Sequence, residues 1–219
     1  MTERPSRAVN SSQTGPHPRL QETVRRHLNA KHLKPVAEHT KAAYAHMLQW
    51  IGDRDNPLIL DACCGVGDSS RALADTFPGH LVIGVDKSAH RLARQRAGRE
   101  PDNLLLLQAD LNDLYPLLAD SALSIDRHYI LYPNPWPKPG HLGRRWHGAP
   151  AFADIVRLGG RLELRSNWRI YLKEFQIALE TTGIDASINQ IVPASPLTPF
   201  EAKYHTSRQD LWQLVKDLG

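Results

Sequence analysis

The chain has 219 residues, of which 41% are hydrophobic and 23% charged, so it can bury one sizeable core and has an ordinary globular composition. The net charge of +4 and the pI near 9.2 are compatible with a nucleic-acid partner without establishing one. No apolar run approaches the roughly 18 to 20 residues of a membrane span, and the N-terminus lacks the apolar core of a signal peptide. The two cysteines, Cys63 and Cys64, are adjacent, where an ordinary disulfide would be badly strained, so we expect a cytoplasmic protein.

The N-terminal part of the chain is basic and divides in two. Residues 1–18 are rich in Ser, Pro, Arg and Asn and nearly free of large apolar groups, which predicts a flexible basic tail. From 19 to 52, leucines, valines and aromatics recur among basic residues, with Pro35 as the one clear interruption. This pattern predicts a helical extension of two helices in front of a core domain at residues 53–219.

The core repeats one pattern, in which a short apolar run is followed by an amphipathic stretch. Such alternation is typical of a parallel sheet covered by helices on both faces. We predict strands at 58–63, 81–85, 104–107, 129–132, 161–164, 186–192 and 200–205. We predict helices at 68–77, 88–98, 111–119, 147–158, 168–179 and 210–218. The fold class is therefore α/β, with a doubly wound, mostly parallel sheet of seven strands.

The turn after the first predicted strand contains two glycines, in the order Asp61-Ala-Cys-Cys-Gly65-Val-Gly67. Glycines at the carboxyl edge of such a sheet let the backbone come close to a ligand. A dinucleotide fingerprint would need a third glycine where Ser70 stands, and the Gly-Lys-Ser/Thr of a Walker loop is absent. The turn resembles motif I of class I S-adenosylmethionine-dependent methyltransferases, which implies that Asp61 lies near the amino acid end of the cofactor.

Carboxylates also follow the second and third predicted strands. Asp86 comes 19 residues after Gly67, the expected place for a side chain that accepts hydrogen bonds from two ribose hydroxyls. Asp110 follows the third strand, where such enzymes hold the adenine amino group. A carboxylate after a strand is also a common helix N-cap, so each of these residues has a structural alternative. Together with the glycine turn, they predict an S-adenosylmethionine site.

The fourth predicted strand runs into a loop with three prolines, Pro133, Pro135 and Pro137, which indicates a stiff, non-helical segment. The loop presents an amide, an aromatic ring and several cations, a set suited to a nucleobase and its phosphates. A plain surface loop with prolines is the alternative. The side chains concerned are Asn134, Trp136, Lys138, His141, Arg144 and Arg145.

The loop sequence Tyr-Pro-Asn-Pro-Trp-Pro-Lys at 132–138, with His141 and the pair at 144–145, resembles the signature of bacterial tRNA (guanine-N7)-methyltransferases. Ser-Asn-Trp at 166–168 is similar to a Thr-Asp segment of that family, and Thr-Pro-Phe-Glu at 198–201 to its C-terminal segment. The resemblance spans about residues 57 to 205. It implies a Rossmann-like class I methyltransferase fold and transfer of a methyl group from S-adenosylmethionine to N7 of a tRNA guanine, with guanine 46 of the variable loop as the target.

The resemblance also implies roles for individual residues. Asn134 is the expected catalytic residue, because it would hold the target base, and Lys138 would hold its phosphate. Trp136 would brace the loop, stack or simply pack, and His141 would contact phosphate or lie in solvent. The substrate contacts implied are Trp136, Lys138, His141, Arg144, Arg145, Asn167, Thr198 and Glu201. The two arginines, together with the basic N-terminal segment, would grip the tRNA backbone.

The departures from the family keep two alternatives open. Asn134 and Asn167 stand where the family has Asp, Gly140 and Gly143 where it usually has basic residues, and Cys63 where it has the first glycine of motif I. Guanine N7 carries a lone pair and no proton, so the reaction needs no general base and the amides need not abolish it. The alternatives are a methyltransferase for another RNA position or a small molecule, and a non-catalytic cofactor- or RNA-binding relative.

The eleven histidines form no ligand-spaced cluster with the cysteines, so we expect no metal site. The expected partner is tRNA, without a membrane, and the sequence leaves monomer and homodimer equally open.

Overall fold

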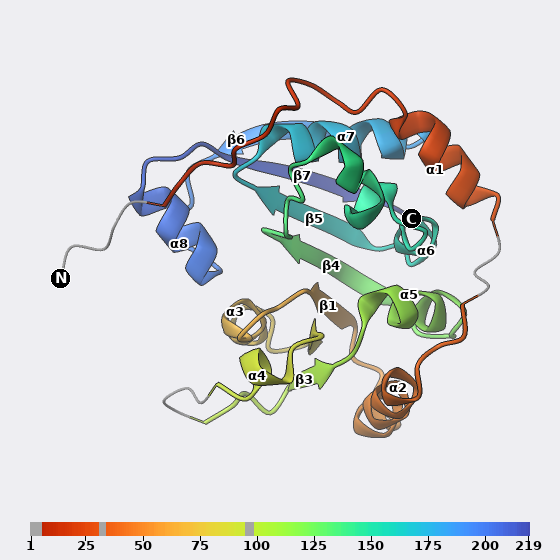
Figure 1. Cartoon of the computed structure of the whole chain (residues 1–219). Helices are drawn as coiled ribbons and strands as arrows, with labels where there is room; N and C mark the ends of the chain where they lie inside the picture. Colours follow the sequence, from red (N-terminus) through yellow and green to blue (C-terminus); the bar gives the residue numbers. More distant parts are fainter. Residues whose placement is uncertain (1–5, 31–33, 95–98) are drawn as a thin grey trace. The chain divides into compact units, whose positions relative to one another are not determined.

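The structure is a computed structural model, and it describes residues 6–30, 34–94 and 99–219. The seven strands form one mostly parallel sheet in the order β3-β2-β1-β4-β5-β7-β6 (Figure 1). The chain divides into two compact units. Unit 1 takes the described parts of Met1–Lys31, Leu131–Ala153 and Glu163–Lys216, and unit 2 those of His32–Ile130, Asp154–Leu162 and Asp217–Gly219.

Unit 2 contains the parallel strands that the sequence predicted first. These are β1 (Leu58–Ala62), β2 (Leu81–Asp86), β3 (Leu104–Gln108) and β4 (Ile125–Leu131), whose last residue belongs to unit 1. β1 pairs in parallel with β2 and β4, and β2 with β3. Every residue of β1 and β2 is buried, which is why their sequences are continuous apolar runs. The helices are α2 (Glu38–Ile51), α3 (Asp68–Thr76), α4 (Ala89–Leu92) and α5 (Leu111–Ala119).

Unit 1 contains the C-terminal strands and the N-terminal helix. β5 (Arg161–Ser166) lies mostly in this unit, and β6 (Ser187–Ile191) pairs antiparallel with β7 (Leu211–Asp217). α1 (Leu20–Leu28) packs beside α7 (Arg169–Thr181), as Figure 1 shows. The 3-10 helices η1 (Pro139–Arg144) and η2 (Trp146–Gly148) precede α6 (Phe152–Arg157) in the chain, and all of α6 from Asp154 on belongs to unit 2. α8 (Pro199–Thr206) lies between β6 and β7 in the chain.

Most predicted elements are confirmed, although the strand predicted at 129–132 begins earlier, at Ile125, and two helices differ more in extent. The helix predicted at 88–98 ends at Leu92, and residues 95–98 lie outside the described residues. The helix predicted at 147–158 is divided between η2 and α6, with Pro150 between them. Both differences arise at places where short helices follow loops.

Two predicted elements near the C-terminus are wrong. The strand predicted at 200–205 is α8, because Pro199 at the first helical position and a Thr198 cap three residues before Glu201 start a helix. The helix predicted at 210–218 is β7. Its buried Leu211 and Leu214 have helical spacing, but the segment pairs with β6 across five residue pairs.

The predicted flexible tail differs over its described part. Residues 1–5 lie outside the described residues. In residues 6–18, the Ser6 N–H donates to Ser207 Oγ (2.8 Å) and the Ser11 hydroxyl donates to the Pro137 carbonyl, so this segment is held against unit 1. Within the described ranges, no helix combines the length and apolar character needed to cross a membrane.

Candidate functional site

Two groups of predicted site residues lie in different units. The cofactor cluster (Asp61, Gly65, Gly67, Asp86 and Asp110) belongs to unit 2, and the loop cluster (residues 132–145, with Asn167 and 198–201) belongs to unit 1.

The glycine turn of the cofactor cluster joins β1 to α3. The Cys64 N–H donates to the Val85 carbonyl (3.0 Å), and the Gly67 N–H to the Cys64 carbonyl (3.0 Å). Gly65 and Gly67 have φ of 64° and 82°, the left-handed region that favours glycine. A Cβ at Gly67 would also lie 2.9 Å from a Leu106 methyl, whereas the space beside Gly65 is open. The turn therefore leaves room for a ligand at Gly65.

Asp61 is completely buried at the end of β1. Its Oδ2 atom accepts hydrogen bonds from the Ser69 and Ser70 hydroxyls, both at 2.6 Å, and its Oδ1 atom has no partner among the described residues. Burial raises the pKa of Asp61 to about 6, and the two hydroxyls oppose that rise. An unpartnered carboxylate oxygen of this kind fits the ammonium group of an amino acid ligand. The sequence reasoning missed the two serines.

Ser70 also explains the absent third glycine. A Cβ at Gly84 on β2 would lie 2.2 Å from Ser70 Oγ, so α3 and β2 approach closely at this point. In a dinucleotide fingerprint the third glycine on the helix gives this close packing. Here the glycine is on the strand.

The Asp86 carboxylate is 3% exposed and already has three donors. It accepts from the Gly65 N–H (3.1 Å), the Ser88 N–H (2.8 Å) and the Arg91 guanidinium (3.1 Å). The Arg91 side chain is 50% exposed, so its guanidinium can move into solvent and leave Asp86 Oδ2 to a ribose hydroxyl. Asp110 caps α5 by accepting from the Asn112 N–H (2.9 Å), the structural alternative that its position had suggested.

The loop cluster begins with strained backbone. Tyr132 and Trp136 have φ of 50° and 44°, which non-glycine residues rarely adopt. The exposed Asn134 accepts the Trp136 N–H through Oδ1 (3.2 Å). One of the two lone pairs of the Asn134 side-chain carbonyl, which was expected to bind the base, is therefore used to close the turn. The second lone pair and the NH₂ group of Asn134 are left for a ligand.

Trp136 is covered by cationic and imidazole groups. The Arg144 guanidinium lies 4.7 Å from the centroid of the indole ring, and His141 meets that ring edge-on at 5.4 Å. These contacts fit the bracing role predicted for Trp136. Partial burial first, and then the charges of Arg144 and Lys138, lower the pKa of His141, so it is neutral at pH 7. Lys138 and Arg144 are exposed, where phosphate can reach them.

Arg145 does not have the predicted position. It is 0% exposed, so the expected contact with the tRNA backbone is wrong. Its guanidinium donates to Glu174 Oε2, to the Trp136 carbonyl (3.2 and 3.0 Å) and to Gln13 Oε1 (3.0 Å). These internal acceptors satisfy a side chain that has only donors. Arg145 is a structural residue under the loop, and the adjacent Arg144 is the exposed one.

Glu174 on α7 is the buried partner of Arg145, and no motif or spacing pointed to it. Oε2 also contacts His147 Nε2 (2.8 Å), and Oε1 accepts from the Gln13 amide (2.5 Å) and the His17 N–H (2.8 Å). Burial alone would raise the pKa of Glu174, but its contacts with His147 and Arg145 lower it to about 2. Glu174 is therefore ionised and tied to two cationic or polar side chains and to the N-terminal segment.

The C-terminal part of the loop cluster is a second buried network. Thr198 caps α8 by accepting the Glu201 N–H (2.9 Å). The fully buried Glu201 accepts from the Tyr132 hydroxyl and from Arg165, both at 2.8 Å. Glu201 is thus fixed next to the first residue of the loop, and because it is 0% exposed and bonded internally, the expected contact with the substrate is wrong.

Asn167 belongs to an amide chain that fixes its orientation. Its Nδ2 donates to Gln209 Oε1 (2.8 Å), and Gln209 Nε2 donates to the Ser6 carbonyl (2.9 Å). The Ser6 carbonyl can only accept, so Gln209 must turn its NH₂ group to Ser6 and its oxygen to Asn167. Asn167 must then turn its NH₂ group to Gln209. The Asn167 carbonyl is then the group left for a ligand, an acceptor as the family's Asp would be.

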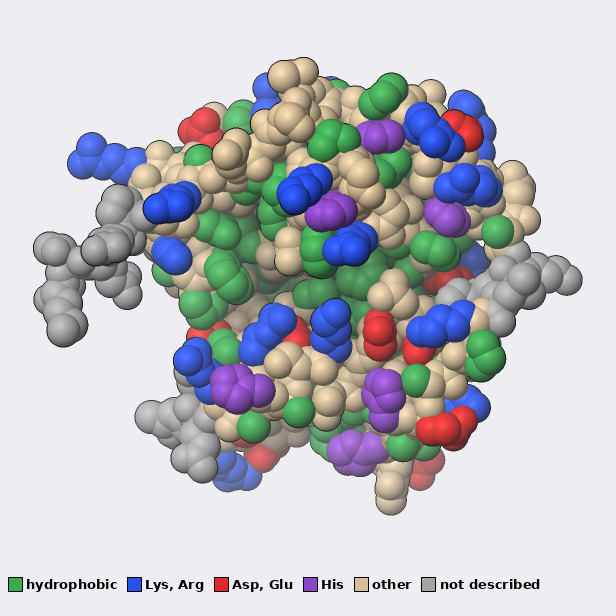
Figure 2. Space-filling model, viewed as in Figure 1, with side chains coloured by type: hydrophobic (Ala, Val, Ile, Leu, Met, Phe, Trp, Pro, Cys, Tyr) green, Lys and Arg blue, Asp and Glu red, His purple; other side chains and the backbone are tan. Residues whose placement is uncertain are grey.

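On the face shown in Figure 2, Lys, Arg and His side chains are interleaved with hydrophobic ones over the elements of unit 1, with few acidic side chains among them. Such a surface attracts a polyanion. Among the residues that the structure describes, no group of three or more His, Cys, Asp or Glu side chains is arranged to hold a metal ion.

Known proteins resemble this chain in sequence and fold. Residues 55–214 match the family model described as "Putative methyltransferase". A protein of Rubrobacter xylanophilus named tRNA (guanine-N(7)-)-methyltransferase is 30% identical over 168 residues, which are 74% of this chain and 73% of that protein. A protein of the same name from Klebsiella pneumoniae is 27% identical over 176 residues, 74% of this chain and 72% of that one. The solved structure of an antibiotic-related methyltransferase has a TM-score of 0.60 at 13% identity and covers 87% of this chain and 97% of its own.

Proposed function

This chain belongs to the methyltransferase family whose model spans residues 55–214, and we propose that it transfers a methyl group from S-adenosylmethionine to N7 of a guanine in tRNA. The observation that carries the proposal is the 30% identity, over 74% of the chain, to a protein named tRNA (guanine-N(7)-)-methyltransferase. The exposed amide and cations of the loop cluster support it, because they suit a nucleobase and its phosphates.

The cofactor cluster fits S-adenosylmethionine. The unpartnered Asp61 oxygen would receive the ammonium group, and the open space at Gly65 would admit the amino acid chain beside Gly67. Asp86 would hold the ribose hydroxyls once Arg91 has moved aside, and Asp110 the adenine amino group. When bound, the cofactor supplies a methyl group made electrophilic by its sulfonium.

The work of the protein's own residues is positioning. Guanine N7 has a free lone pair and loses no proton, so the reaction depends on alignment of the nucleophile with the methyl group. Asn134 would hold the base, with its second carbonyl lone pair on the guanine N1–H or N2–H. Asn167 and Thr198 would complete the base contacts, whereas the buried Glu201 would hold Tyr132 at the start of the loop.

Phosphate contacts would come from the exposed cations. Lys138 and Arg144 are exposed, and His141 would donate one hydrogen bond without a charge. Neutral amides make weaker hydrogen bonds than carboxylates, so Asn134 and Asn167 would give a working site with altered strength. We assign residues 53–219 to the methyltransferase domain, residues 19–52 to a helical extension, and the protein to the cytoplasm.

The direct test is to incubate the purified protein with methyl-labelled S-adenosylmethionine and an unmodified tRNA transcript, and then to identify the labelled nucleoside. Label in 7-methylguanosine supports the proposal. Label in another nucleoside, or cofactor binding without any label, contradicts it.

The proposed target is guanine 46 of the variable loop. A transcript in which adenine replaces guanine 46 should accept no label. A transcript in which adenine replaces a different exposed guanine should accept label as before. The variant with Asn134→Asp and Asn167→Asp is the control for divergence. A large gain of tRNA methylation in that variant would argue that the natural chain had moved away from this substrate.

A further inference from the structure

The N-terminal segment crosses unit 1 as an extended strap with one packed face. Its residues are half-buried at 11, 13, 15 and 17 and exposed at 12, 14 and 16. This period of two is that of an extended chain lying on a surface. Figure 1 shows the segment passing α7 before it enters α1.

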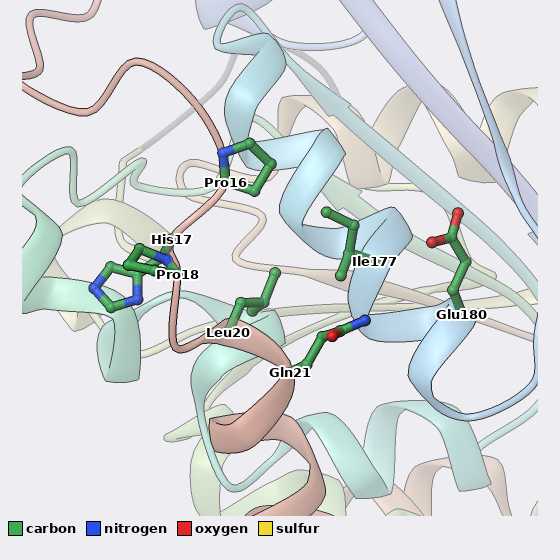
Figure 3. Close-up of a pocket in the computed structure, with 7 residues that line it drawn as sticks. All are labelled: Pro16, His17, Pro18, Leu20, Gln21, Ile177 and Glu180. Carbon is green, nitrogen blue, oxygen red and sulfur yellow. The ribbon is translucent and has the colours of Figure 1, made fainter.

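The strap ends where it meets α7. Figure 3 shows His17 and Pro16 leading into Leu20 and Gln21 of α1, opposite Ile177 and Glu180, around a pocket of about 280 Å³. Leu20 is buried, and α1 packs beside α7. The strap is therefore anchored at this end by apolar packing.

The strap holds the loop cluster through backbone carbonyls. Three successive carbonyls, at residues 136–138, each accept a hydrogen bond. Arg145 donates to the first (3.2 and 3.0 Å) and the third (3.3 Å), and Ser11 donates to the second. Trp136 has a left-handed backbone, which persists only where surrounding contacts impose it. These bonds are such contacts.

Gln13 connects the strap to the buried ion pair. Its Oε1 accepts from Arg145 (3.0 Å), and its Nε2 donates to Glu174 and to the Gly15 carbonyl (2.7 Å). The His17 N–H donates to the same Glu174 oxygen (2.8 Å). One oxygen of the buried carboxylate is thus bonded by the strap and the other by Arg145 and His147.

We propose that residues 11–17 are a positioning element for the methyl-transfer site. Ser11 holds the backbone of residues 136–138 directly and Gln13 holds it through Arg145, so that Asn134 and Lys138 face the substrate. The inference rests on the function proposed above. The contacts at Ser11 and Gln13 come from uncharged side chains, so the strap acts on the geometry of the loop and not by attracting phosphate.

The test compares two double variants of the full-length protein. The inward variant, Ser11→Ala with Gln13→Ala, removes the two side chains that contact the rest of unit 1. The exposed variant, Ser12→Ala with Thr14→Ala, removes two neighbouring side chains that face solvent. We expect the inward variant to lower kcat for tRNA methylation by about tenfold to a hundredfold, the effect of a misplaced reacting group. Its cofactor affinity and its slope of log KM against log salt should equal those of the exposed variant. Ser11→Thr, which keeps the hydroxyl, should retain the activity.

Equal kcat values in the two double variants would overturn the proposal. So would a higher KM with a shallower salt dependence, which indicates a tail that attracts tRNA. Hydrogen exchange without tRNA separates this proposal from the proposed function. The inward variant should speed exchange of the amides at 134–145 and the exposed variant should not, whatever the substrate proves to be. Unchanged exchange in the inward variant would overturn the strap even if tRNA methylation is found.

Discussion

The adjacent arginines at 144 and 145 give a matched pair of substitutions. Replacing Arg145 should lower the stability of the fold, and replacing Arg144 should weaken binding of tRNA. Arg145→Met leaves the Glu174 carboxylate, which is 0% exposed, without its guanidinium partner. Breaking a buried pair from one side costs about 3–5 kcal/mol, because an uncompensated charge stays buried. The Trp136 carbonyl also loses its Arg145 donor, whereas the Lys138 carbonyl keeps the His141 N–H (2.9 Å). His147, Gln13 and the His17 N–H continue to bind Glu174. We therefore expect a loss of about 3–5 kcal/mol for the whole change.

The assay is urea unfolding of the two single variants beside the unchanged protein. Arg144→Met removes an exposed side chain and should change the free energy of unfolding by no more than about 0.5 kcal/mol. It should instead raise KM for tRNA and reduce the slope of log KM against log salt by about one. A loss below about 1 kcal/mol in Arg145→Met, or an equal loss in Arg144→Met, would refute the reasoning.

Three further predictions concern single positions. Burial raises the pKa of Asp61 from 3.8 to about 6. Protonation of Asp61 therefore stabilises the folded protein fully below about pH 4, and this stabilisation is lost as the pH rises through 6. Asp61→Asn should therefore be about 3 kcal/mol more stable than the unchanged protein at pH 8 in urea unfolding, yet lose cofactor binding in calorimetry, and an equally stable variant would contradict this. Gln209→Leu frees the Asn167 amide and should lower kcat/KM for tRNA by about tenfold, whereas Gln209→Glu still accepts from Asn167 and should lower it less. Gly140 has open space beside it, so Gly140→Arg should fold normally and steepen the salt dependence of KM by about one, and an unchanged slope would show that phosphate does not pass there.

The parallel half of the sheet could be predicted because its strands carry their own signal. β1 and β2 are buried at every residue, so both begin as apolar runs, and the carboxylates Asp61 and Asp86 stand near their carboxyl ends. The antiparallel edge could not be predicted in the same way. β6 is mostly exposed or half-buried, and β7 has only two buried residues, at helical spacing. Its strand conformation follows from pairing with β6, which is a tertiary contact.

The residue types of the candidate site could be predicted from the sequence, but which of these residues are buried could not. Nothing in two consecutive arginines distinguishes the one that is buried from the one that faces solvent. The difference lies in Glu174 and Gln13, which are 161 residues apart in the chain. The same holds for Ser70, whose fit against Gly84 joins two elements and replaces a glycine that the motif led us to look for. Pairings of this kind are created by the fold.

Methyl transfer to two tRNA transcripts that differ only at position 7 of their guanines would show most directly whether N7 is the nucleophile. One transcript contains guanine, and the other contains 7-deazaguanine, which has carbon in place of N7 and otherwise keeps the same base edges for pairing. We expect label in the first transcript, none in the second, and comparable binding of both, because N7 is the nucleophile. Equal labelling of the two transcripts would contradict it.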